Sequence, residues 1–146
     1  MLDKVLDKLD WRLYALLSAV FAAATAILAK IGVEGLPSNT ATAVRTVVIL
    51  LFAWGIALAR GEVAPLLDVS RKTMLFLVLS GIATGLSWLA YFHALKIGPA
   101  HRVAAVDKTS LALTTLLAFL VLKEPITLRV GCGIAMMIGG ALLTIK

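Results

Sequence analysis

The chain has 146 residues, of which 61% are hydrophobic and 15% charged, and its mean hydropathy is +1.01. A water-soluble domain carries about 45–50% apolar and about 25% charged residues, so this composition excludes an ordinary soluble globule. The net charge is +6, but in so apolar a chain the Lys and Arg excess bears on membrane orientation and does not indicate nucleic-acid binding.

Residues 1–12 predict a short amphipathic helix that lies in the membrane interface. Leucine and valine recur there at helical spacing, while Lys4, Lys8 and Arg12 form an i,i+4 row. Acidic residues alternate with these bases and no cleavage site follows, so the segment is not a signal peptide. Trp11 and Tyr14 are typical of the headgroup level.

Apolar runs fill the rest of the chain, residues 13–146, and predict a single domain of five transmembrane helices. The runs lie at about 13–33, 39–59, 73–95, 103–122 and 127–145. Each is close to the ~20 residues that cross a ~30 Å hydrocarbon core. The connections between them contain Pro37, Pro65, Pro99 and Pro125, one in each, and proline interrupts helices. The predicted fold class is all-α: a polytopic membrane bundle of five helices preceded by the amphipathic helix.

Basic residues divide almost equally between the two membrane sides. Side A, the N-terminal side, receives Lys4, Lys8, Arg12, Arg60, Arg71, Lys72, Lys123 and Arg129. Side B receives Lys30, Arg45, Lys96, Arg102, Lys108 and Lys146. Because the positive-inside rule needs an asymmetry, two orientations stay open: side A in the cytoplasm, or insertion both ways with assembly as an antiparallel pair.

The same three-residue segment ends two of the spans. Lys30-Ile31-Gly32 closes the first and Lys96-Ile97-Gly98 the third, and the span that follows each carries a basic residue, Arg45 or Lys108. The repeat indicates either paired hairpins of common origin or coincidence.

Five ionisable residues fall inside the predicted spans, all in the half nearer side B. They are Lys30, Arg45, His93, Asp107 and Lys108. A charge at mid-membrane costs roughly 2.5–3.5 kcal/mol on insertion scales, so each needs a reason. Stripes of small residues on the first and third spans direct Lys30 and His93 into the bundle.

Explanations of these charges that involve no ligand remain open. Lys30 and His93 lie near span ends, from which they can reach the interface, and Arg45 with Asp107 can form a purely structural ion pair. Asp107 and Lys108 are neighbours, so their side chains should project about 100° apart. Because one acid then faces several cations, the cluster favours an anionic or zwitterionic ligand.

Motifs of catalysis and metal binding are absent from the sequence. It contains no P-loop, no H-E-x-x-H pair and no G-x-S-x-G elbow. His93 and His101 lack the neighbours expected of a metal site, and Cys132 lies in an apolar run. We therefore expect no enzyme, no metal and no cofactor.

Several segments resemble the EamA family of the drug/metabolite transporter superfamily. They are YALLSAVFAAATAILAKIGVEG, TATAVRTVVILLFAWG, GLSWLAYFHALKIGPAHRVAAVDKTS and LKEPITLRVGCGIAMMIGGALL. The last resembles the family's Glu-Pro turn followed by a glycine-spaced helix, and together the segments cover residues 13–146. The amphipathic N-terminal segment lies outside the resemblance.

The resemblance implies a transport function and a dimer. Most similar proteins carry two five-span repeats of opposite orientation and move metabolites by alternating access, whereas this chain has one repeat. An antiparallel homodimer would restore the ten-span form, with the site at the repeat interface. The related small multidrug resistance proteins use a first-span glutamate that this chain lacks, so drug-cation/proton exchange is not expected.

The resulting hypothesis is a small-metabolite exporter in the cell inner (plasma) membrane, acting as an antiparallel homodimer. The candidate substrate-binding residues are Arg45, Lys108, Asp107, His93, Lys30, Trp88 and Tyr91. Arg45 and Lys108 would contact the negative group, Asp107 would orient one of them or meet an amino group, and the two aromatic residues would stack. Lys30 and His93 would line the vestibule. The alternative is a non-transporting membrane subunit or half of a heterodimeric transporter.

Overall fold

Five long apolar helices make up residues 10–145, the part of the chain described by a computed structural model. They are α2 (Trp11–Gly32), α3 (Ser38–Ala59), α4 (Arg71–Ile97), the segment Ala100–Leu122 and α7 (Leu128–Ile145). The all-α fold with five helices long enough to span a membrane is thereby confirmed. The expected amphipathic helix falls almost wholly on residues 1–9, outside the described residues.

The fourth long helix is interrupted in its middle. It consists of α5 (Ala100–Asp107), α6 (Ser110–Leu117) and a π-helical turn, η2 (Ala118–Leu122). At the break, the Thr109 hydroxyl donates to the Val106 carbonyl at 2.7 Å. Such side-chain bonding to the preceding turn competes with the helix ladder and bends helices. A short 3₁₀ turn, η1 (Ala64–Asp68), lies in the connection between α3 and α4.

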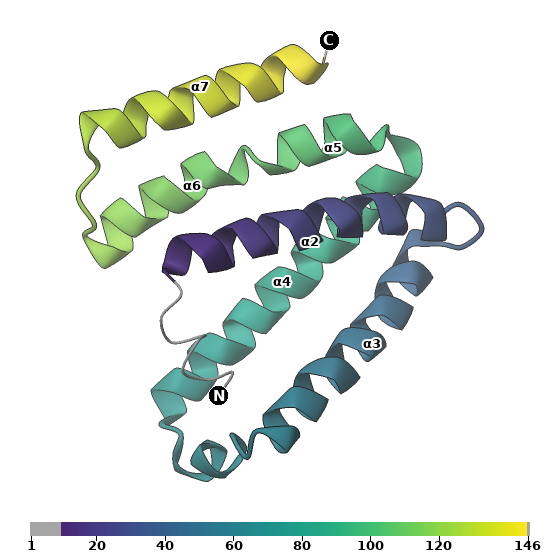
Figure 1. The fold of residues 1–146 in the computed structure, drawn as a ribbon, viewed down its shortest axis with the longest axis vertical. Helices are drawn as coiled ribbons and strands as arrows, with labels where there is room; N and C mark the ends of the chain where they lie inside the picture. The colour runs from purple at the N-terminus through teal and green to yellow at the C-terminus, as the bar shows by residue number, and fades with distance from the viewer. Residues whose placement is uncertain (1–9, 146) are drawn as a thin grey trace.

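Helix α4 lies at the centre of the arrangement, in contact with α2, α3 and α5, while α7 packs on α5 and α6 (Figure 1). The buried core is concentrated where α2 and α4 end and α3 and α5 begin. Ala29, Phe92 and Leu95 form it, and Leu95 is fully buried. This end corresponds to side B of the predicted topology.

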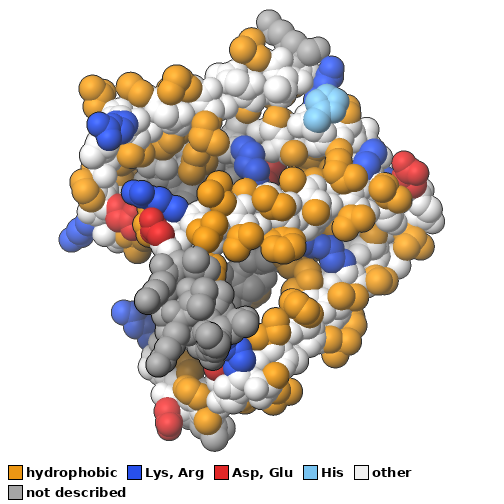
Figure 2. Space-filling model, in the orientation of Figure 1, with side chains coloured by type: hydrophobic (Ala, Val, Ile, Leu, Met, Phe, Trp, Pro, Cys, Tyr) orange, Lys and Arg blue, Asp and Glu red, His pale blue; other side chains and the backbone are white. Residues whose placement is uncertain are grey.

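Most of the apolar surface of the helices is left uncovered. In the most apolar stretch of each of the five helices, no more than 6% of the residues are buried. Figure 2 shows apolar side chains spread over the visible face of the molecule. Since one side of a helix in a complete bundle faces its neighbours, these helices retain apolar faces for lipid or for a second subunit.

Candidate functional site

Most of the candidate residues line one cavity of about 410 Å³ between α2, α3, α4 and α5. Its charged and aromatic lining is Arg45, Trp88, Tyr91, Asp107 and Lys108. These residues come from three helices, and the fold brings them together near the break between α5 and α6. Of the five ionisable residues predicted to cluster, Arg45, Asp107 and Lys108 line this cavity.

The wall on α2 is made almost entirely of alanine. Ala19, Ala22, Ala23 and Ala26 line the cavity on that side. Because a methyl group fills little volume, this wall leaves space for a ligand between α2 and the polar groups opposite. This wall belongs to the stripe of small residues on the first span that the sequence indicated as a packing surface.

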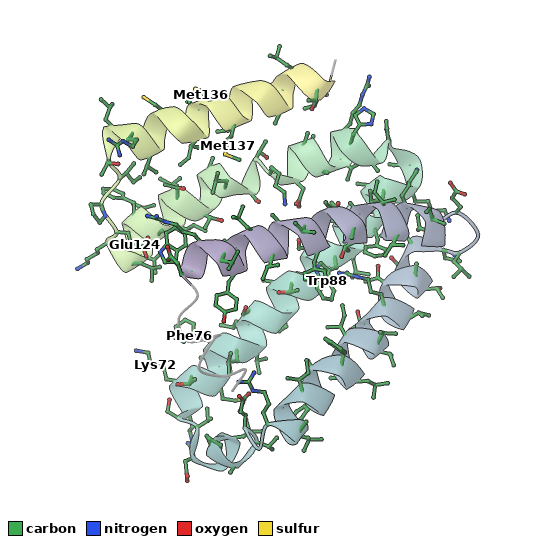
Figure 3. All side chains as sticks on the ribbon, viewed as in Figure 1. Lys72, Phe76, Trp88, Glu124, Met136 and Met137 are labelled. Atoms are coloured by element: carbon green, nitrogen blue, oxygen red, sulfur yellow. The ribbon has the colours of Figure 1, made fainter. Side chains whose placement is uncertain are left out.

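Arg45 lies against aromatic rings. Its guanidinium carbon is 4.2 Å from the ring centroid of Trp88 and 5.2 Å from that of Phe92. Cation–π contacts of this kind contribute about 0.5–2 kcal/mol. A guanidinium that contacts a ring through its face keeps its in-plane N–H donors available to an anion. Figure 3 shows Trp88 on α4 where that helix passes α2.

Asp107 pairs with its neighbour Lys108. The Lys108 Nζ is 3.6 Å from the Asp107 Oδ2, although adjacent helical positions diverge by about 100°. The two side chains therefore meet, contrary to the expectation that they cannot share a direction. The backbone at Lys108 stays in the right-handed helical region, and the long lysine side chain reaches back to its neighbour. The structural Arg45–Asp107 ion pair that the sequence left open is not among the ion pairs of residues 10–145, where Asp107 pairs with Lys108 and Arg45 contacts aromatic rings. One carboxylate and two cations leave the cavity with a surplus positive charge.

Lys30 and His93 do not line this cavity. The His93 Nδ1 is 3.4 Å from the Ser38 hydroxyl. The Lys30 ammonium donates to the backbone carbonyls of Leu95 at 2.7 Å and Gly98 at 3.1 Å. Both side chains are thus engaged at the side-B end of the helices, beyond the cavity.

Three lining or neighbouring residues were missed from the sequence. Thr25 and Ser87 add hydroxyl groups to the cavity, and Phe92 supplies the second ring beside Arg45. Phe92 had a readable signal, because it lies four residues after Trp88 and so shares its helix face. A second cavity of about 360 Å³ adjoins the first at Thr25 and Arg45 and has a largely apolar lining that includes Leu28, Val44 and Phe92.

The sequence is similar to those of known proteins. The model of the EamA-like transporter family matches residues 10–146. The chain belongs to the EamA-like transporter family. It is 48% identical, over 134 residues, to a protein of Sinorhizobium sp. described as an uncharacterized transporter in the cobO 3′ region; the match covers 92% of this chain and 95% of that protein. No solved structure matches the present chain.

Membership of the EamA-like family, together with five helices long and apolar enough to cross a bilayer, makes the chain a multi-pass membrane protein. It also favours transport over catalysis as the function.

Proposed function

We propose that this EamA-like protein exports a small anionic or zwitterionic metabolite across the cell inner (plasma) membrane by alternating access. The observation that carries the proposal is the cavity in which Arg45 and Lys108 outnumber the single acid Asp107. A carboxylate or phosphate would accept hydrogen bonds from the guanidinium and the ammonium, and such charge-assisted bonds are the strong ones. Asp107 would meet the amino group of a zwitterion.

The transporting unit in this proposal is an antiparallel homodimer. Each subunit leaves the apolar faces of its five helices largely uncovered, and the basic residues divide almost equally between the two sides. A second copy in the opposite orientation would cover part of that surface and produce the inverted repeats common among transporters. It would also place one basic cavity near each side of the membrane.

A non-transporting subunit, or half of a heterodimeric transporter, is the second candidate. The observation that favours it is the packing of Arg45 on Trp88 and Phe92, because a purely structural arginine would be held in the same way. In that case replacement of Arg45 would deplete the folded protein, and no conservative change in the cavity would act on ligand binding alone.

Lys108→Gln separates the two candidates. We expect the detergent-solubilised wild-type protein to show a raised melting temperature with at least one amino acid or organic anion in a thermal-shift screen, and the variant to lose that shift. The side chain of Lys108 is 62% exposed, so its replacement should leave the fold intact. Lys123→Gln, a matched change outside the cavity, should keep the shift. A screen in which only cations stabilise the wild type would contradict the proposal.

A further inference from the structure

Two lysines bind the backbone of each other's hairpin at the side-B end of the fold. Lys30, near the end of α2, donates to the carbonyls of Leu95 and Gly98 at 2.7 and 3.1 Å. Lys96, near the end of α4, donates to the Leu36 carbonyl at 2.8 Å. The α2–α3 hairpin and the α4–α5 hairpin are thereby joined in both directions.

The hydrogen bond from Lys30 supplies a donor to a backbone carbonyl that lacks its usual helical partner. The carbonyl of Leu95 would ordinarily accept from the N–H four residues later, but that residue is Pro99, which has no N–H. Leu95 is fully buried, and a buried carbonyl without a donor is costly. The ammonium of Lys30 supplies the donor and also places a positive charge at the negative end of α4.

The two lysines are equivalent in their hairpins. Each begins a Lys-Ile-Gly segment. Lys30 reaches Gly98, the residue before Pro99, and Pro99 is the N-cap of α5. Lys96 reaches Leu36, the residue before Pro37, which is the N-cap of α3.

The turn within the α4–α5 hairpin is tightly packed at Gly98. A Cβ added to Gly98 would lie 3.1 Å from both the Ala94 carbonyl oxygen and a methyl group of Val103.

The contacts lie between the cavity and side B. On α4 the cavity residues Trp88 and Tyr91 come before the buried Phe92 and Leu95, and Lys96 follows them. On α2 the cavity wall ends at Ala26, before the buried Ala29 and then Lys30. Along α2 and α4 a ligand in this cavity therefore meets the core and the lysine contacts, while the second cavity continues beside them to Gly32 and Leu36.

We infer that Lys30 and Lys96 are positioning residues that form a reciprocal clasp, holding the two hairpins together and narrowing the path from the cavity toward side B. The inference rests on the proposed transport function, since alternating access requires the clasp to release when the cavity opens to that side. Lys30 accordingly acts on the backbone of the neighbouring hairpin and does not contact the substrate.

The test measures the distance between the two hairpins directly. The single cysteine of the chain, Cys132, is first replaced by alanine. Spin labels are then attached to Glu34→Cys, in the turn between α2 and α3, and to His101→Cys, in α5. Both labelled positions are exposed. Labelled protein is diluted with excess unlabelled protein, so that pulsed electron resonance reports distances within one subunit whatever its orientation in the membrane.

We expect the wild type to show a dominant population with a short distance between the two labels. The double variant Lys30→Met/Lys96→Met should lose this population in favour of longer distances. Lys30→Arg, which keeps a cationic donor, should retain the population. Lys72→Met is the control, because Lys72 lies at the opposite end of α4 (Figure 3). Lys96→Met alone removes a single contact from an exposed residue and should give an intermediate distribution even if the double variant fails to fold.

An unchanged distance distribution in the lysine variants would overturn the clasp, including when their melting temperature falls, because that result is a structural effect alone. The measurement needs no ligand, so it is separable from the proposed function. If Lys108→Gln loses ligand binding but the label-to-label distances do not change in the Lys30 and Lys96 variants, the transport site is retained and the clasp is rejected. Responsive distances in a protein that binds no anion or zwitterion would reject the transport role.

Discussion

Replacement of Arg45 by glutamine is expected to lower the affinity for the anionic or zwitterionic ligand about 10- to 100-fold. A hydrogen bond to a charged group is worth about 1.5–3 kcal/mol, and each 1.4 kcal/mol is about tenfold in affinity. The guanidinium is held over Trp88 and Phe92 with its N–H groups available, and glutamine removes both the charge and the planar donor set. Titration calorimetry with the ligand found by thermal shift measures the loss.

Two further variants distinguish binding from folding in this experiment. Arg45→Lys keeps the charge but loses the flat face that stacks on Trp88, so we expect an intermediate affinity. Arg129→Gln removes an arginine outside the cavity and should bind as wild type does. Wild-type affinity in Arg45→Gln would contradict the assignment. Loss of helical circular dichroism in Arg45→Gln would instead favour the structural subunit.

Cysteines placed on either side of the membrane should each be labelled from both sides. The near-equal division of basic residues gives the insertion machinery little bias, and an antiparallel homodimer requires both orientations. Gly35→Cys, in a Cys132→Ala background, puts a single thiol in the first side-B turn, where an added Cβ meets nothing within 4 Å. A membrane-impermeant maleimide applied to sealed cells, and then to inverted vesicles, should modify a comparable fraction each time.

Glu62→Cys, in the connection that follows α3 on side A, provides the matched position. Dual orientation gives the same two-sided labelling at this residue. Labelling of Gly35→Cys from one side only, with Glu62→Cys labelled only from the other, would exclude the antiparallel pair and leave a fixed topology.

The five-helix fold was predictable because hydropathy and proline act locally. A run of about 20 apolar residues has few stable alternatives to a membrane-spanning helix, and the four prolines fall in the connections between those runs. The gathering of Arg45, Asp107 and Lys108 was also predictable in outline, because alternating span direction assigns a depth to each residue. Depth alone placed these side chains in one half of the membrane.

Pairwise contacts between these side chains could not be predicted from the sequence. The Lys108 side chain reaches its neighbour Asp107, and nothing in the apolar pattern of residues 103–122 marks either this contact or the interruption of the helix after Asp107. Lys30 and Lys96 were readable as span ends, but their backbone acceptors lie more than 55 residues away along the chain. Such contacts depend on how helices pack and on long flexible side chains, which periodicity does not encode.

Counterflow in proteoliposomes tests the central claim most directly. Vesicles containing the wild-type protein are loaded with the unlabelled anion or zwitterion that raised its melting temperature, and entry of the radiolabelled compound is followed. We predict saturable entry that is absent from protein-free vesicles and strongly reduced in vesicles containing Arg45→Gln at equal protein content. Entry into wild-type vesicles no faster than into protein-free vesicles, despite measurable binding, would contradict transport through this cavity.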